Sequence, residues 1–467
     1  MAERNHIYYD FTISLCSTCL RRVDAKVIFQ DELVFMLKRC PEHGREQVLI
    51  ATDIDYYKRC RHYLKPGEVP LKFNTRTHFG CPYDCGLCPD HEQHSCLTLI
   101  EVTDRCNLSC PICYASSGPM HGRHRTLAEI EHMFDVIVAN EGRPDVVQVS
   151  GGEPTVHPDF FAILDIAKRK PIRHLMVNTN GIRIAKDRAF AERLAGYMPD
   201  FEIYLQFDSF KPDVLKRLRG EDLSTTRQKA IDHLNEFNLS TTLVVTVEKG
   251  ANDDELGEII NYGLKQRCVR GVTFQPVQVA GRTEDFDPSR DRITLTEVRQ
   301  GILDQSPLFT PEDIVPVPCN PDALAMGYAL KLNGEVFPLT RMIDPDDLLN
   351  NSRNTIVYEQ DERLKEHMVK LFSTGTPSDK AAETLHSIMC CLPNIDAPQL
   401  GYENLFRIII MRFIDAYDFD VRAIKRSCVH IVDPNTEKII PFETMNLFYR
   451  DAKKLERLEE LRDPGGA

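Results

Sequence analysis

The sequence predicts an α/β protein built on a partial, TIM-like (β/α)6 barrel, with a small metal-binding ribbon before it and a C-terminal region that carries further metal-ligating cysteines. Three observations predict this fold class. Strand-like and helix-like segments alternate between residues 97 and 281. Eleven of the 16 cysteines precede residue 114, and the chain beyond residue 281 is rich in proline. We expect domains at residues 1–60, 61–96, 97–281 and 282–467.

Composition excludes several classes of protein. The 467 residues are 42% hydrophobic and 27% charged, which is typical of a soluble globular protein. A net charge of −13 argues against a general nucleic-acid binder, which would have a basic surface. The sequence has no apolar run of 18 residues and no signal peptide, so we expect a cytoplasmic protein. Sixteen cysteines in such a chain indicate metal binding and not a disulfide scaffold.

The first 60 residues contain two metal-binding knuckles. Cys16 and Cys19 form the first, and Cys40 and His43 form the second, with strand-like residues between the two. Three thiolates and one imidazole make a closed tetrahedral site, which would stabilise a module too small to fold on its own core. Cys60 is the alternative fourth ligand. The sequence leaves open whether the ion is zinc or iron.

A first cysteine triplet, with spacing CxxxCxxC, lies just before the predicted barrel. Cys81, Cys85 and Cys88 could bind three irons of an auxiliary [4Fe–4S] cluster, which normally takes four cysteines. Cys96 is the nearest candidate for the fourth ligand. The alternative for Cys96 is a buried free thiol.

The predicted barrel consists of six strand–helix units joined by short polar segments. Chemistry in such barrels occurs at the C-terminal ends of the strands. The strand-like segments are 97–102, 146–149, 174–178, 202–207, 241–247 and 271–275, and the helix-like segments are 126–140, 158–169, 185–195, 225–237 and 253–266.

A second cysteine triplet follows the first predicted strand of the barrel. Cys106, Cys110 and Cys113 can hold three irons of a [4Fe–4S] cube and leave the fourth iron without a protein ligand. An open iron resembles the open position of a catalytic metal site. The alternative reading is a zinc knuckle.

The second triplet and the aromatic Tyr114 after it resemble the signature of the radical S-adenosylmethionine (SAM) superfamily. The stretch Gly151, Gly152, Glu153 and Pro154, which ends the next predicted strand, resembles the second motif of that superfamily. The resemblance implies that SAM chelates the open iron, that Glu153 holds the SAM amine, and that SAM is cleaved to a 5′-deoxyadenosyl radical that abstracts hydrogen.

Polar residues at the ends of later strands resemble the SAM contacts of that superfamily. Such residues could equally be helix caps and turns. The candidates are Asn178, Asn180, Gln206 and Asp208, with Thr246 as a weaker one and Gln275 on the adenine side.

The C-terminal region contains four cysteines that could bind another auxiliary cluster: Cys319, Cys390, Cys391 and Cys428. Each could instead be a small buried hydrophobic residue. Residues 328–332 and 335–339 are expected to form a hairpin that turns at Asn333-Gly334.

Nearly the full length resembles one subgroup, the archaeal-type tetraether lipid synthases and their relatives. The N-terminal knuckles, residues 78–89 and the stretch from His94 to Cys96 carry this resemblance. Unlike that subgroup, the chain has no cysteine at residues 320–326 or 441–446.

The resemblance to the tetraether lipid synthases implies a radical SAM enzyme that joins lipid alkyl chains by sp3 C–C bonds. It implies a hydrophobic lipid substrate, peripheral contact with the inner face of the membrane, and an electron donor such as ferredoxin or flavodoxin. The alternative function is a radical SAM C-methylase acting on a pterin or another small molecule. A third reading is a non-catalytic, metal-stabilised binding module.

Overall fold

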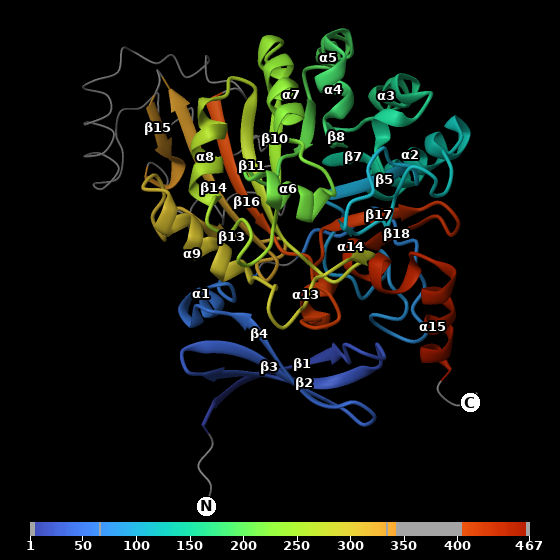
Figure 1. The fold of residues 1–467 in the computed structure, drawn as a ribbon. Coiled ribbons are helices and arrows are strands. Elements are labelled where there is room, and N and C mark those ends of the chain that lie inside the picture. The colour runs from blue at the N-terminus through green and yellow to red at the C-terminus, as the bar shows by residue number, and fades with distance from the viewer. Residues whose placement is uncertain (1–4, 65–66, 333–334, 342–403, 464–467) are drawn as a thin grey trace, which may run out of the picture.

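The computed structural model describes residues 5–64, 67–332, 335–341 and 404–463 (Figure 1). A curled parallel sheet forms its centre, and the six predicted strands are all present and adjacent in the order of the chain. The expected α/β barrel class is therefore confirmed. These strands are β5 (Leu97–Thr103), β7 (Val146–Gly151), β8 (His174–Thr179), β9 (Phe201–Gln206), β10 (Thr241–Val247) and β11 (Val269–Pro276).

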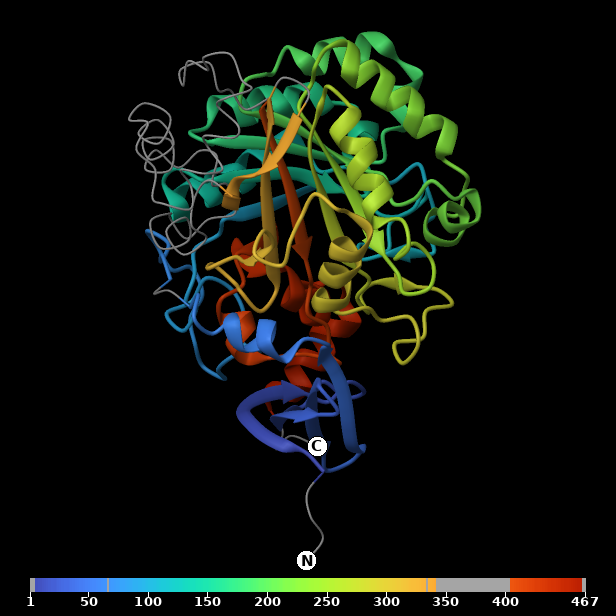
Figure 2. The ribbon, with the colours of Figure 1, turned by 90° about the vertical axis from the view of Figure 1, so that its left-hand side faces the viewer.

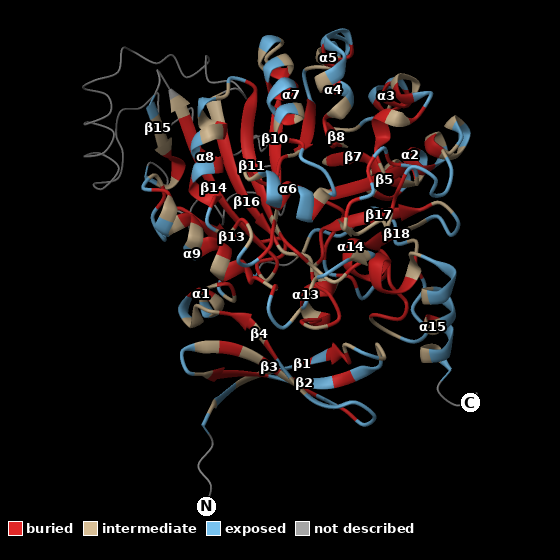
Figure 3. Ribbon diagram, in the orientation of Figure 1, coloured by how far each residue is buried: buried red, intermediate tan, exposed pale blue. Residues whose placement is uncertain are grey.

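Helices cover the outer face of this sheet, and their buried sides pack on strands that are buried almost throughout (Figure 3). Thr126 caps the first of them with a capping box to Glu129. One of them, α6, lies outside the helix-like segments expected from the sequence. The helices are α2 (Leu127–Glu141), α3 (Phe160–Arg169), α4 (Ile182–Lys186), α5 (Arg188–Ala195), α6 (Pro212–Arg219), α7 (Ser224–Glu236) and α8 (Leu256–Lys265).

Strands from the C-terminal region extend the sheet on both sides. β16 (Leu405–Met411) pairs in parallel with β11, and β17 (Val429–Asp433) pairs in parallel with β5. The expected hairpin is present as β14 (Leu324–Leu332) and β15 (Glu335–Pro338), and β14 also pairs with β16. β13 (Val315–Pro316) and β18 (Lys438–Pro441) complete the two edges. Both edges of the six-stranded sheet are thus paired.

The N-terminal ribbon is a four-stranded antiparallel sheet below the barrel (Figure 2). The ribbon has its own small core, centred on Val27, Val34 and Met36. Its strands are β1 (Ile7–Leu15), β2 (Arg22–Gln30), β3 (Leu33–Cys40) and β4 (Gly44–Ala51), and α1 (Ile54–Arg59) follows them.

Several short elements complete the described chain: the strands β6 (Ile112–Cys113) and β12 (Arg282–Thr283), the helices α9 (Leu295–Gln305), α13 (Val421–Lys425), α14 (Phe442–Thr444) and α15 (Ala452–Arg462), and a π-helical turn at Met445–Tyr449. Among the residues described, no helix is both long enough and apolar enough to cross a bilayer.

A buried ion pair closes the N-terminal end of the barrel. Glu202 of β9 accepts hydrogen bonds from Arg407 of β16 at 2.6 and 2.7 Å, and both side chains are buried. His174 of β8 lies 3.2 Å from the same carboxylate, and Thr242 of β10 donates to it. Because side chains alternate across a strand, these residues share the inner face of the sheet with the pocket described next.

Candidate active site

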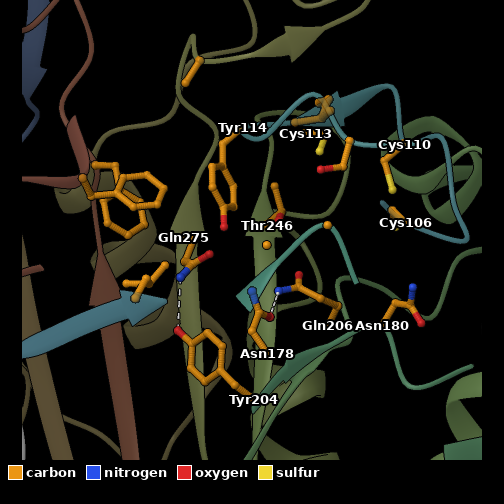
Figure 4. Close-up of a pocket in the computed structure, with 18 of the residues that line it drawn as sticks. Cys106, Cys110, Cys113, Tyr114, Asn178, Asn180, Tyr204, Gln206, Thr246 and Gln275 are labelled. Carbon is orange, nitrogen blue, oxygen red and sulfur yellow. Dashed lines mark hydrogen bonds between the residues drawn. The ribbon is translucent and has the colours of Figure 1, made fainter. Parts of the chain in front are cut away.

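The pocket lies inside the barrel at the C-terminal ends of its strands, and all three cysteines of the second triplet line it (Figure 4). Other predicted residues in its wall are Gly151, Gly152, Glu153, Asn178, Asn180, Gln206, Thr246 and Gln275. The structure therefore gathers into one cavity residues that span 170 positions of the sequence. This location is the one expected for the chemistry of such a barrel.

The side chain of Arg282 holds the backbone of the loop that carries Cys106, Cys110 and Cys113. Arg282 of β12 donates to the carbonyl oxygens of Cys110 and Ser117, at 2.5 and 2.9 Å. Burial raises the pKa of the Cys106 thiol to about 12. Burial also raises the pKa of Cys110, although the neighbouring Arg219 guanidinium opposes that rise. A buried set of thiols with a cation beside it suits a group that binds thiolates and supplies compensating charge.

Gly151 and Gly152 allow β7 to approach the cysteine loop closely. Gly151 has φ +123°, and a Cβ atom there would lie 2.3 Å from the carbonyl oxygen of Thr103. A Cβ atom on Gly152 would lie 2.2 Å from the carbonyl oxygen of Arg105. Both contacts are too close for any other residue, so this spacing requires glycine.

Glu153 lines the pocket but is already anchored within the protein. One carboxylate oxygen accepts hydrogen bonds from the Thr155 hydroxyl at 2.6 Å and the Thr179 hydroxyl at 2.7 Å. The other accepts from the backbone N–H of Asn180 at 2.8 Å. Burial raises the pKa of Glu153, and these hydrogen bonds oppose the rise. The carboxylate is thus fixed in place and can accept a further bond from a cationic amine.

A chain of hydrogen bonds crosses the pocket wall from β7 to β10. Asn178 donates to the Ser150 hydroxyl at 3.2 Å. The Asn178 carbonyl accepts a hydrogen bond from Gln206 at 2.9 Å (Figure 4). Arg219 in turn donates to Gln206 at 2.9 Å and to the Thr246 hydroxyl at 2.8 Å. These groups orient one another and present a polar surface to a ligand.

Asp208 does not line the pocket; it lies behind the wall and anchors both Arg219, which does line the pocket, and the buried Arg227. The buried carboxylate accepts from Arg219 at 2.5 and 2.8 Å and from Arg227 at 2.7 Å. Burial would raise the pKa of Asp208, but the two arginines outweigh it and lower the pKa.

Arg219 lines the pocket, although no pattern in the sequence predicted it, and the same holds for Tyr204, Phe413 and Phe442. Arg219 ends α6, where a basic residue is usually a partner of the helix dipole, so nothing in the sequence distinguished it.

The far end of the pocket is aromatic and amide-lined. Phe413 and Phe442 stack with ring centroids 4.1 Å apart, and Tyr114 lies 4.9 Å from Phe442. Gln275 donates to the Tyr204 hydroxyl at 3.1 Å (Figure 4). Flat apolar surface beside amide groups suits a planar, hydrogen-bonding ligand.

The ribbon brings Cys16, Cys19, Cys40 and His43 together, with all four ligand atoms within 4.8 Å of one another. His43 Nδ1 lies 3.5 Å from the sulfur atoms of both Cys16 and Cys40. Cys60 is buried apart from this group, in the core of the barrel. The geometry therefore favours His43 over Cys60 as the fourth ligand.

We expect His43→Ala to lose most of the roughly one equivalent of metal that a closed tetrahedral site binds. Three thiolates without the imidazole leave the site open and weaken the ribbon, which depends on its metal. Metal analysis after gel filtration measures the loss. Cys60→Ala is the matched control and should keep its metal; loss of metal in that variant instead would return Cys60 to the site.

The first cysteine triplet lies under the C-terminal helices. The Tyr449 hydroxyl accepts from the backbone N–H of Cys85 at 3.1 Å. Burial raises the pKa of the Cys85 thiol. Asp84 accepts hydrogen bonds from the backbone at His78, Phe79 and Gly80 and so shapes the loop.

Cys96 lies close to other cysteines than the sequence led us to expect. Its sulfur groups with those of Cys319 and Cys428, all within 4.8 Å, and all three residues are buried. Cys96 is the next cysteine along the chain after Cys81, Cys85 and Cys88, which is why it was the nearest candidate for their fourth ligand. β5 and β17 pair directly after Cys96 and Cys428, and this pairing brings the two together. Cys390 and Cys391 lie outside the described residues.

Comparison with known proteins identifies the class that this fold and site define. A family model of the radical SAM superfamily matches residues 100–263, and the chain belongs to that superfamily, whose members use SAM and a [4Fe–4S] cluster. A second model, the HMPTM N-terminal zinc ribbon domain, matches residues 8–52.

Within the superfamily, the chain belongs to the family of 7,8-dihydro-6-hydroxymethylpterin dimethyltransferase from Methanocaldococcus jannaschii. The two are 32% identical, and the alignment covers 94% of each chain. A GTP 3′,8-cyclase from Alkaliphilus oremlandii is 31% identical over 39% of this chain and 57% of its own length. Streptococcus suis SuiB, whose structure is solved with S-adenosylmethionine, has 17% identity and a TM-score of 0.37, covering 44% of this chain and 46% of its own.

The prediction that the enzyme couples lipid chains is wrong. The relative that matches almost the whole chain is named as a pterin dimethyltransferase and not as a lipid synthase. The N-terminal knuckles and cysteine triplets that suggested the tetraether subgroup specify metal sites, so they did not distinguish the substrate.

Proposed function

We propose that this protein is a radical SAM C-methylase whose substrate is a pterin, such as 7,8-dihydro-6-hydroxymethylpterin. The observation that carries the proposal is the 32% identity, over 94% of both chains, to a dimethyltransferase of that pterin. The bound iron–sulfur cluster and SAM would together supply a radical able to abstract hydrogen from carbon.

In this proposal, Cys106, Cys110 and Cys113 ligate the cluster that binds SAM. The carboxylate of Glu153, fixed by Thr155 and Thr179, accepts the SAM amine. The guanidinium of Arg219 lies beside Gln206 and Thr246. Its positive charge would balance the negative charge of a SAM carboxylate bound there. Asn178, Asn180, Gln206 and Thr246 supply polar contacts to SAM, and Asp208 acts through Arg219.

The aromatic end of the pocket supports a pterin as the second ligand. A pterin is flat and carries hydrogen-bond donors and acceptors along one edge. The stacked pair Phe413 and Phe442 offers it a face, and the side-chain amides of Gln148 and Gln275 line the same cavity.

We expect the reconstituted, reduced protein to convert 7,8-dihydro-6-hydroxymethylpterin into products heavier by one or more CH₂ units. Methylation replaces a hydrogen on carbon by a methyl group, and SAM is the donor of that group when S-adenosylhomocysteine is released in step; coupling of two chains removes two hydrogens and adds no carbon. Mass spectrometry of an anaerobic reaction with SAM, carried out with and without the pterin, measures this difference.

A lipid extract is the matched alternative substrate in that experiment. A lipid product whose mass is two hydrogens less than the sum of its two precursors, with the pterin unchanged, would contradict the proposal. Phe442→Leu provides a further control, since it removes the stacking face while leaving the three cysteines in place; pterin methylation should fall more than SAM cleavage does.

A further inference from the structure

One buried amide in the pocket wall has no partner within the protein. Gln148 of β7 lines the cavity, and only 3% of its surface is exposed. Its chain neighbours Val147 and Val149 pack in the core beneath the helices, whereas Val146 packs in the inner core with Leu99. Since side chains alternate across a strand, Gln148 points into the barrel. Among the described residues, its Nε2 has no hydrogen-bond partner.

The strands on both sides of β7 explain why this amide is unpaired. Gln148 is the register partner of Leu99 in β5 and of Met176 in β8. Both neighbours are apolar, so neither can satisfy the amide. Burying an unpaired amide costs free energy, and a leucine or methionine would fill the same space without that cost. A glutamine at this position therefore indicates a ligand that pairs with it.

Gln148 lies deeper in the barrel than the residues that we assign to SAM. It precedes Ser150 by two residues and Glu153 by five along the chain. A strand rises about 3.3 Å per residue, so Gln148 lies about 7 Å further from the C-terminal end of β7 than Ser150 does. The Ser150 hydroxyl belongs to the polar wall, since it accepts from Asn178 at 3.2 Å and lies 3.3 Å from the Tyr114 hydroxyl. Gln148 is thus placed to meet a second ligand below SAM, and not SAM itself.

The chemistry of a pterin decides which of its ends meets this amide. All carbon-bound hydrogens of 7,8-dihydro-6-hydroxymethylpterin lie on its pyrazine ring and on the hydroxymethyl group, so this half has to face the cysteine loop for hydrogen abstraction. The pyrimidine ring carries no C–H bond, and its edge presents the N3–H donor beside the C4 oxygen acceptor. The side chain of glutamine offers one acceptor oxygen and one donor nitrogen side by side, which match this edge.

We propose that Gln148 determines substrate specificity by pairing with the N3–H and C4 oxygen of the pterin. The amide oxygen accepts from N3–H, and Nε2 donates to the C4 oxygen. This inference rests on the proposed function and adds to it the orientation of the ring. Anchoring the pyrimidine edge at the deep end of the pocket directs the pyrazine carbons toward Cys106, Cys110 and Cys113, where the radical would form.

Equilibrium binding of two ligands tests this pairing in the reconstituted, SAM-loaded protein without reductant. One ligand is 7,8-dihydro-6-hydroxymethylpterin, and the other is its analogue with hydrogen in place of the C4 oxygen, in which N3 carries no proton. We expect the native protein to bind the analogue roughly 10- to 100-fold more weakly, because the analogue leaves the buried amide unpaired. Gln148→Leu should bind both ligands with about equal affinity. Fluorescence titration of each ligand measures the dissociation constants.

Gln275→Leu is the matched control for this experiment. It removes another amide from the same cavity, one that already donates to the Tyr204 hydroxyl at 3.1 Å. This variant should keep the native preference for the pterin over the analogue, and both variants should contain as much iron as the native protein. Equal binding of the two ligands by the native protein, or the native preference retained in Gln148→Leu, overturns the role of Gln148. A native protein that binds neither ligand overturns the proposed pterin substrate, and this pairing with it.

Discussion

Replacing Cys106, Cys110 and Cys113 together by alanine should abolish formation of 5′-deoxyadenosine from SAM. The three sulfur atoms lie on one loop in the pocket wall, and they are the thiols that the described part of the chain contributes to that wall. The variant should lose about four irons and four sulfides per chain. Chromatography of reaction mixtures and iron analysis measure both effects.

Iron that remains in this variant reports on the other cysteine groups. We expect the first triplet and the Cys96, Cys319 and Cys428 group to keep their metal, because cysteines of both groups pack in a different core cluster from Cys106, Cys110 and Cys113. Cys268→Ala is the matched control: it removes a buried cysteine of the barrel core and should leave SAM cleavage intact. Undiminished SAM cleavage in the triple variant would mean that the SAM site lies elsewhere.

Local sequence patterns were sufficient to predict the barrel and the grouping of Cys16, Cys19, Cys40 and His43. Each of the six parallel strands is a short apolar run followed by polar strand-end residues, and the helices between them have clear apolar faces. His43 could be predicted because it occupies a ligand position in a knuckle. Such features depend on neighbours in the chain, so the sequence alone displays them.

Features that depend on distant parts of the chain could not be predicted. β16 and β17 join the sheet beside strands that lie more than 130 and 330 residues earlier, respectively. Nothing in their composition indicates which edge each strand covers. The pairing of β17 with β5 places Cys96 beside Cys428 and Cys319, and not beside the cysteines nearest to it in the sequence.

The polar wall of the pocket was also predicted only in part, because some of its contacts join distant parts of the chain. Asn178, Gln206 and Thr246 end predicted strands, so they could be expected to line the site. The sequence could not predict the ion pair between Arg219 and Asp208. This buried pair forms only when α6 packs beside β9 and β10. The substrate was misjudged because metal-binding motifs recur in enzymes with different substrates.

The ion pair that closes the barrel should be the most sensitive point of its stability. We expect Arg407→Met to lower the free energy of unfolding by about 3–5 kcal/mol, since it leaves the buried Glu202 carboxylate uncompensated. The double variant Glu202→Gln/Arg407→Met should recover much of this loss, because it removes both charges. Urea unfolding of the metal-loaded protein, followed through the transition of the barrel, measures the difference.

The pH dependence of unfolding provides a second test of the same pair. Burial would raise the pKa of Glu202, but Arg407 and the hydrogen bonds from His174 and Thr242 outweigh burial and hold the pKa well below its usual range. A depressed carboxyl pKa contributes stability above the unfolded value of about 4.3, and this stability is lost as the pH falls below it. The native protein should therefore lose stability on acidification more steeply than the double variant. Equal slopes, or an Arg407→Met variant as stable as the native protein, would show that the pair does not hold the barrel closed.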